Sequence, residues 1–383
     1  MSAAPNGPKL NFAFFRTADG IPYTLVPLIP IAVVLELIGA SASVIFIVAA
    51  IGIIPTAALM GRATEELAAQ SGPGIGGLLN VTFGNAPELI IALFALGAGL
   101  QEVVKASIIG SILGNILLVL GGAMVAGGIG RAGEVQKFDR TAASVQSTML
   151  FLAATALVMP AIYELIEGKG LPGVNAELVN YGGTVEHLSL AVAVVLLATY
   201  VAGLFFSLRT HKNVFNPSGD DDSHDDDLWG WSVRTAVIAL AIAGVAVGVM
   251  SEILVGSISE ASASIGLSEF FVGVIVVAIV GNAAEHWVAV LVAYRGKMNL
   301  AVNIAIGSSA QVALFVGPAL VLASFLIGPS PMPLVLNGFE LGAVLIAVLL
   351  ANQVTHEGES TWFEGVQLLA VYAILAIAFF AAG

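Results

Sequence analysis

Long apolar runs, separated by short polar or glycine-containing stretches, account for most of this 383-residue chain. A helix that crosses a bilayer needs about 20 consecutive, mostly apolar residues. Runs of that length recur from one end of the sequence to the other, so the pattern predicts an all-α polytopic membrane protein with about eleven transmembrane helices. The predicted spans are 21–39, 42–60, 74–98, 103–127, 141–163, 185–208, 232–252, 267–293, 298–325, 332–352 and 362–382.

The composition supports this fold class. The chain is 58% hydrophobic and 10% charged, whereas soluble proteins carry about 25% charged residues. It has no cysteine, so it can form neither a disulfide framework nor a thiolate metal site. The first twenty residues lack a signal-peptidase pattern, and we expect the first apolar run to remain as a helix. A net charge of −13 without a basic patch argues against a nucleic acid partner.

The lysines and arginines predict the orientation in the membrane. With the N-terminus in the cytoplasm, only Lys105 and Lys169 fall in outer segments, and every other basic residue falls on the inner side. Because basic residues concentrate on the cytoplasmic side, we expect the N-terminus inside and the C-terminus outside. Lys105, near an outer helix end, is expected to snorkel toward the interface.

Two segments of the chain repeat one pattern. The first begins GNAPE and runs on to GSILGN, and the second begins GNAAE and runs on to GSSAQ. Glu88 and Glu285 are 197 positions apart, as are Ser111 and Ser308. GRATE and GSISE extend the repeat upstream. The chain therefore contains an internal duplication.

Each copy holds five predicted spans, and an odd number forces the copies to insert in opposite directions. We therefore expect two inverted five-helix repeats and one extra N-terminal helix. The predicted divisions are 1–40 with helix 1, 41–208 as the first repeat, 209–231 as an acidic cytoplasmic linker, and 232–383 as the second repeat. The linker has six Asp in eight positions. It is interpreted as a disordered, solvated connection, with a cation-collecting or regulatory segment as the alternative.

Glu88 lies near the middle of its predicted span. A bare carboxylate at that depth costs at least a few kcal/mol, so it needs a partner, a proton or a cation. Pro87 interrupts helical hydrogen bonding beside it, and irregular backbone inside a membrane must face protein or a cavity. Glu285 repeats the situation, with Ala284 in place of the proline. The alternative, two structural carboxylates bonded to neighbouring helices, is disfavoured by their duplication.

Neutral oxygen donors follow each glutamate. Ser111 and Asn115 are four residues apart, Ser308 and Gln311 are three apart, and each pair shares a helix face. Calcium takes about six to eight oxygen ligands from carboxylates, amides, carbonyls and water. The two glutamates with these side chains and freed carbonyls match that need, although interhelical hydrogen bonding is an alternative role for the polar residues.

The paired carboxylates also predict how transport is coupled. Two like charges close together in a low dielectric resist being ionised at once, so the pair would hold either protons or one dication. No lysine or arginine lies in the middle of a predicted span, which favours a cation over an anion. HExxH, GxxxxGK[ST] and GxSxG are absent. We therefore expect neither an enzyme nor transport driven by ATP on this chain.

Other ionisable residues give weaker signals. Glu66 is expected at a solvated helix end, and His286 is expected to be packed and hydrogen-bonded. Glu340, with Asn337 one turn earlier on the same face, is either a proton-path group or a structural hydrogen-bond partner. The secondary site candidates are Glu65 and Glu260, at the entrances, and Glu340.

The two repeated segments resemble a known family. TFGNAPELIIALFAL with SIIGSILGNILLVLG is similar to the first repeat motif of the calcium/cation–proton antiporters, and VGNAAEHWVAVLVA with NIAIGSSAQVALFV to the second. That family belongs to the calcium:cation antiporter superfamily, which includes the sodium/calcium exchangers. The resemblance implies alternating access, with a moving pair formed by helices 2 and 7. The implied site residues are the acidic ligands Glu88 and Glu285, with Asn85, Asn282, Ser111, Asn115, Ser308 and Gln311 around them.

The expected function is export of cytoplasmic calcium in exchange for protons at a midplane site. Calcium would be the transported substrate, with no cofactor. The short N-terminus is like that of microbial members, which predicts the cell (inner) membrane of a microbe. An exchanger for sodium and calcium, or for another cation, remains an alternative. A passive cation channel fits less well, because pores usually use symmetric rings of charge. The sequence leaves the oligomeric state open.

Overall fold

The computed structural model describes residues 14–131, 133–174, 183–211 and 229–383, and most of them are helical. The Asp-rich part of the predicted linker, 220–227, lies outside the described residues.

In the first half the elements are η1 Phe14–Arg16, η2 Ile21–Leu25, α1 Leu28–Leu37, α2 Ala42–Gly84, α3 Ala86–Gly97, α4 Gln101–Leu113, η3 Gly114–Val119, α5 Leu120–Gly128, β1 Gln136–Lys137, α6 Arg140–Ile166, α7 Gly183–Phe205 and η4 Phe206–Thr210. In the second half they are α9 Val233–Ile265, α10 Glu269–Phe271, η5 Val272–Val277, α11 Ala278–Gly281, α12 Ala283–Tyr294, α13 Met298–Gln311, η6 Val312–Val316, α14 Gly317–Ser324, α15 Gly338–Thr355, β2 Glu359–Ser360 and α16 Trp362–Ala382.

Eight helices in the described part of the chain are long and apolar enough to cross a membrane. Two further helix pairs pass the same test together but are bent, by 44° at Asn85 and by 59° at Asn282. The stretch Ile21–Leu37 is a shorter apolar helix at the place of the first predicted span. The polytopic helical class predicted from the sequence is therefore confirmed.

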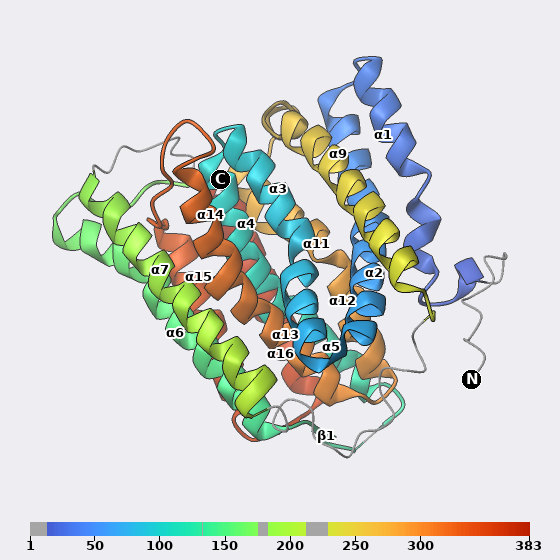
Figure 1. Ribbon diagram of the computed structural model, residues 1–383. Coiled ribbons are helices and arrows are strands. Elements are labelled where there is room, and N and C mark those ends of the chain that lie inside the picture. Colours follow the sequence, from blue (N-terminus) through green and yellow to red (C-terminus); the bar gives the residue numbers. More distant parts are fainter. Residues whose placement is uncertain (1–13, 132, 175–182, 212–228) are drawn as a thin grey trace.

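The long helices α2 and α9 lie side by side and run in opposite directions (Figure 1). Near the start of α2, Ser43 Oγ lies 2.5 Å from Ser264 Oγ near the end of α9. Farther along α2, Gln70 Nε2 donates to the carbonyl of Trp231, just before α9 begins. α1 packs on this pair, whereas α6 and α7 form the opposite side of the molecule (Figure 1).

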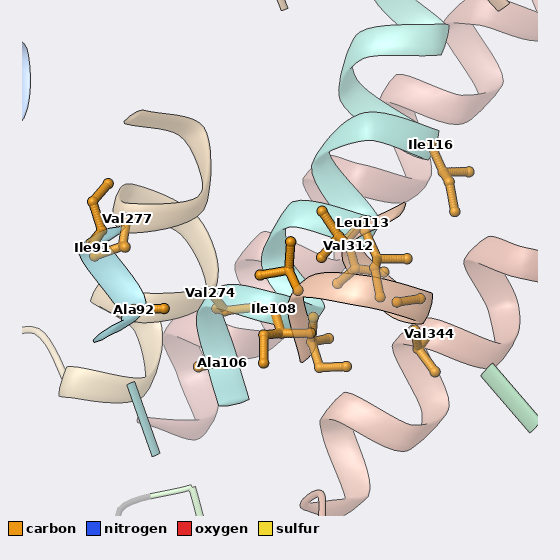
Figure 2. Close-up of a cluster of buried hydrophobic side chains, with 14 of the residues drawn as sticks. Ile91, Ala92, Ala106, Ile108, Leu113, Ile116, Val274, Val277, Val312 and Val344 are labelled. Carbon is orange, nitrogen blue, oxygen red and sulfur yellow. The ribbon is translucent and has the colours of Figure 1, made fainter. Parts of the chain in front are cut away.

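The core joins α3 and α4 from the first predicted repeat to η5 and η6 from the second. Figure 2 shows Ile91 of α3 beside Val277 of η5, and Leu113 of α4 beside Val312 of η6. α4 and η5 approach closely because of a glycine. A Cβ added to Gly110 would lie 2.0 Å from the Val274 carbonyl oxygen, so no larger residue fits there. The contact surface between the halves is thus apolar and tight.

Two predicted boundaries need correction. The helical stretch of α2 continues from the predicted span 42–60 through to Gly84. It folds back on the way, because a Cβ on Gly76 would lie 2.3 Å from the Ala68 carbonyl oxygen, whereas residues eight apart in a straight helix are separated by about 12 Å.

The predicted span 332–352 begins later than expected, at Gly338 in α15. Asn337 is not one turn earlier on the same helix but is the N-cap, and its side chain accepts from the backbone N–H of Glu340. Glu340 in turn accepts from the Asn337 N–H, which completes a capping box. The residues before the cap are not helical, and Pro331 and Pro333 lack the N–H that a helix would use.

The expectation that Lys105 snorkels is wrong. Its side chain is 2% exposed and lies inside the protein. The ammonium group is 2.5 Å from Glu102 and donates to the carbonyl of Val335 at 3.1 Å. A buried ammonium needs such partners, and the non-helical segment before α15 supplies one of them.

The antiparallel packing of α2 on α9 predicts a cross-link. In Ser43→Cys/Ser264→Cys, the two sulfurs replace hydroxyl oxygens 2.5 Å apart, which is compatible with a disulfide. Because the chain has no native cysteine, mild oxidation should produce one intramolecular bond, detected as a loss of thiol labelling that reductant reverses. Each single variant serves as the control. Persistent labelling of both cysteines after oxidation would contradict the packing.

Candidate functional site

The two predicted central glutamates occupy the same position on two interrupted helices. The chain breaks at Asn85 between α2 and α3, and at Asn282 between α11 and α12. Glu88 is the third residue of α3 and Glu285 is the third residue of α12. The predicted irregularity beside both carboxylates is therefore present. A helix N-terminus carries free N–H groups and a partial positive charge, which favours an anionic side chain there.

The asparagines at the two breaks reach across to the opposite copy of the repeat. Neither side chain caps its own helix. Asn282 Nδ2 donates to Ser111 Oγ at 2.9 Å, and Asn85 Oδ1 lies 3.4 Å from Ser308 Oγ. These two pairs match under the 197-residue offset of the duplication, so equivalent residues in the two copies make reciprocal contacts.

The side chain of each glutamate also reaches into the opposite copy of the repeat. A Cβ on Gly281 would lie 3.2 Å from Glu88 Cγ, and a Cβ on Gly84 would lie 3.6 Å from Glu285 Oε1. Each carboxylate side chain therefore packs against the glycine of the other GNA(P/A)E motif. Glycine at these two positions lets the broken helices approach closely enough for Glu88 and Glu285 to lie at one contact between them.

The two carboxylates are not equally satisfied by hydrogen bonds. Ser308 Oγ donates to Glu285 Oε2 at 2.6 Å. Glu88 is buried, and among the described residues its Oε2 has no hydrogen-bond donor. Asn282 Oδ1 is likewise buried without a donor from that part of the chain. The site thus presents acceptor oxygens that a cation or a proton can satisfy, as a hard cation with oxygen ligands requires.

The remaining predicted ligands are engaged with other side chains in this structure. Asn85 Nδ2 donates to Gln311 Oε1 at 2.5 Å. Asn115 Oδ1 lies 3.1 Å from His286 Nε2. The expectation that His286 is hydrogen-bonded is confirmed, but its partner is a predicted site residue, which its position beside Glu285 could have suggested. η3 and η6, both π-helical, begin within one residue of Asn115 and Gln311, and such turns are frequent at functional sites.

The secondary candidates do not join this cluster as central ligands. Glu65 is exposed and pairs with Arg62 at 3.3 Å, and Glu260 is exposed on α9. Glu340 is buried in its capping box, and Lys105 acts on it electrostatically. The expectation of a solvated Glu66 is wrong, because its side chain is 2% exposed. No group of three or more histidine, aspartate or glutamate side chains suited to a metal ion occurs among the described residues.

Comparison with known proteins agrees with this architecture. A family model described as "Sodium/calcium exchanger protein" matches residues 41–209 and 235–381. The Ca(2+)/H(+) antiporter of Synechocystis sp. is 42% identical in an alignment that covers 95% of this chain and 98% of that protein. The Ca(2+)/H(+) antiporter ChaA of Bacillus subtilis is 43% identical over 353 residues, covering 92% and 96%.

Solved structures share the fold. Native YfkE superposes with a TM-score of 0.78 at 39% identity, over 94% of this chain and 99% of that one. The H+/Ca2+ exchanger CAX superposes with a TM-score of 0.70 at 15% identity, over 96% and 93%, and supports the fold alone. The resemblance carried by the two repeated motifs is therefore confirmed, and the chain belongs to the sodium/calcium exchanger protein family.

Proposed function

We propose that this chain is a secondary active antiporter that exports calcium from the cytoplasm in exchange for protons. The observation that carries the proposal is the pair of glutamates at matched helix breaks, each packed against the glycine of the other copy. The relatives named as Ca(2+)/H(+) antiporters, similar along nearly their whole length, support it. The chain would act as a transporter and not as an enzyme, with calcium as cargo and no resident cofactor.

The inverted repeat gives this pair its transport role. The described spans, with the two bent pairs and the short apolar helix Ile21–Leu37, are compatible with eleven crossings. The antiparallel course of α2 and α9 and the reciprocal asparagine–serine contacts are what a two-fold axis in the membrane plane would produce. The proposed divisions remain 1–40, 41–208, 209–231 and 232–383, and the family model matches two stretches with similar limits.

The proposed orientation follows from the basic residues, with the N-terminus in the cytoplasm and the C-terminus outside. The chain would lie in the cell (inner) membrane of a microbe. With this orientation the Asp-rich linker faces the cytoplasm. The exchanged partners are then cytoplasmic calcium and external protons.

Glu88 and Glu285 carry both substrates in this proposal. Two ionised carboxylates in one low-dielectric environment repel each other. One calcium ion neutralises both at once, and protons neutralise them one by one. Simultaneous full occupancy is unfavourable, so loading one substrate displaces the other. This exclusion couples the two fluxes without ATP.

The surrounding amides and hydroxyls supply the neutral oxygens. Asn282, which follows the glycine that Glu88 packs against, is bonded to Ser111, whereas Ser308 is bonded to Glu285 and lies 3.4 Å from Asn85. Asn115 and Gln311 complete the proposed set, and in this structure they are bonded to His286 and Asn85. Each of these two amide oxygens accepts one hydrogen bond and keeps a second lone pair, which is available to a calcium ion. Glu65, Glu260 and Glu340 stay outside the central set.

Flux measurement in reconstituted vesicles tests the function. An imposed pH gradient should drive calcium movement, and a protonophore should abolish it, because proton flow supplies the energy. A sodium gradient of equal size is the control and should drive none. Calcium flux that follows sodium and ignores pH would identify a sodium/calcium exchanger. Flux that ignores both gradients would indicate a channel.

Neutralising either central glutamate should abolish exchange. Glu88→Gln and Glu285→Gln keep the side-chain shape but cannot give up a proton or neutralise a dication, so we expect a loss of at least about 100-fold in rate, on the order of two charge-assisted bonds. Glu36→Gln, at an exposed position on α1, should transport normally. Size-exclusion chromatography checks folding. Near-normal flux from either central variant would remove that residue from the site.

Calcium affinity should fall as the pH falls, because protons and calcium compete for the same carboxylates. Between roughly pH 8 and 6, the calcium concentration needed for half-maximal binding should rise, by at most about tenfold per pH unit for each proton displaced. Binding is followed by calcium-dependent protection against thermal unfolding at several pH values. A midpoint that does not change over this range would contradict the shared site.

A further inference from the structure

A buried carboxylate outside the central pair accepts hydrogen bonds from two backbone N–H groups of another segment. Glu66 lies on α2, and its Oε1 accepts from the Trp229 N–H while its Oε2 accepts from the Trp231 N–H at 2.8 Å. Both tryptophans precede α9, whose N-cap is Ser232. The carboxylate therefore fastens the beginning of one long helix to the side of the other.

Glu66 belongs to a row of three side chains that contact the same segment. Arg62 places its guanidinium carbon 4.9 Å from the ring centre of Trp229, and Gln70 donates to the Trp231 carbonyl. Positions 62, 66 and 70 are four apart and so lie on one face of α2. We call Arg62, Glu66, Gln70, Trp229 and Trp231 the α2–α9 clasp.

Two charged groups of the described residues lie near the clasp. Glu65 on α2 pairs with Arg62 at 3.3 Å, and Asp19 of the N-terminal segment acts electrostatically on Tyr23, whose ring lies 5.9 Å from that of Trp229. The two N–H donors suit the two oxygens of a carboxylate. Charge-assisted bonds of this kind are about twice as strong as neutral ones.

The pair held by the clasp supports the helix that carries Glu88. Met60 of α2 with Ala243 and Val247 of α9 form a buried cluster, and Ala86 and Ile90 of α3 pack against it. Ala86 and Ile90 are four apart and share a face of α3. Glu88 lies midway between them in sequence, about 200° round the helix from each, and so points away from the cluster.

We infer that Glu66 is a positioning residue for transport, which holds α2 and α9 together as one wall behind α3 and so supports Glu88 during turnover. It touches no ion. The part of this inference that concerns exchange rate rests on the proposed function, whereas the part that concerns helix packing does not. Loss of the carboxylate should slow turnover and leave calcium binding unchanged, because the central hydrogen bonds do not involve α9.

The test compares Glu66→Ala and Glu66→Gln with Glu364→Gln. Glu364 is a matched control, because it also accepts a backbone N–H bond at the start of a spanning helix, but within its own capping box on α16. We expect both Glu66 variants to lose about tenfold in maximal exchange rate per folded molecule, comparable to one charge-assisted hydrogen bond. Their half-saturating calcium concentration should stay within about twofold of the parent, a fold-change worth less than one hydrogen bond. Glu364→Gln should keep both values.

Tryptophan emission gives a readout independent of transport. In a Trp287→Phe/Trp362→Phe background only Trp229 and Trp231 remain of the four tryptophans, and Glu66→Ala should shift their emission to the red as they become solvated. Gln70→Ala should give the same shift, smaller in size, and serves if Glu66→Ala fails to fold. Unchanged emission, or a normal rate per folded molecule, would overturn the inference. A half-saturation that rises in step with the loss of rate would make Glu66 a cation ligand and also overturn it. Absence of pH-driven flux in the parent would refute the proposed function and leave the emission test standing.

Discussion

The cost of placing two carboxylates inside a bilayer governs this structure. Each charge costs at least a few kcal/mol at that depth unless something compensates for it. The chain compensates in part with helix N-termini, since Glu88 and Glu285 each lie in the first turn of a half-helix, and with the hydroxyl of Ser308. This compensation is incomplete at Glu88, whose Oε2 has no hydrogen-bond donor among the described residues.

The helix breaks serve two purposes at once. They expose N–H groups toward the carboxylates, and they place the motif glycines where the other copy's glutamate must pack. Because the contacts are reciprocal, neither repeat can form its half of the site alone. The symmetry is nonetheless incomplete, because Asn115 is bonded to His286 whereas Gln311 is bonded to Asn85.

Polar groups outside the centre are held by backbone atoms of irregular segments. Lys105 donates to the carbonyl of Val335, Glu340 accepts from the N–H of Asn337, and Glu66 accepts from the two N–H groups before α9. Unpaired backbone groups are costly in the membrane interior. The free N–H and carbonyl groups next to helix ends therefore pair with buried charged side chains. This explains why residues expected at solvated helix ends are buried.

The sequence by itself determined the membrane class, the duplication and the identity of Glu88 and Glu285 as a matched pair, because hydrophobic run length, internal repetition and the cost of a buried charge are local properties of the chain. The tertiary structure decided the rest. That Asn282 meets Ser111, that Glu88 packs on Gly281, and that Glu66 holds α9 all depend on residues more than 160 positions apart. The sequence around Asn337 contains the N-x-x-E pattern of a helix start, which indicates an N-cap there. The apolar residues on both sides of it, however, also matched one continuous spanning helix over 332–352. Hydropathy records how much of a segment is apolar, whereas the partners of its few polar atoms are fixed only when the helices pack.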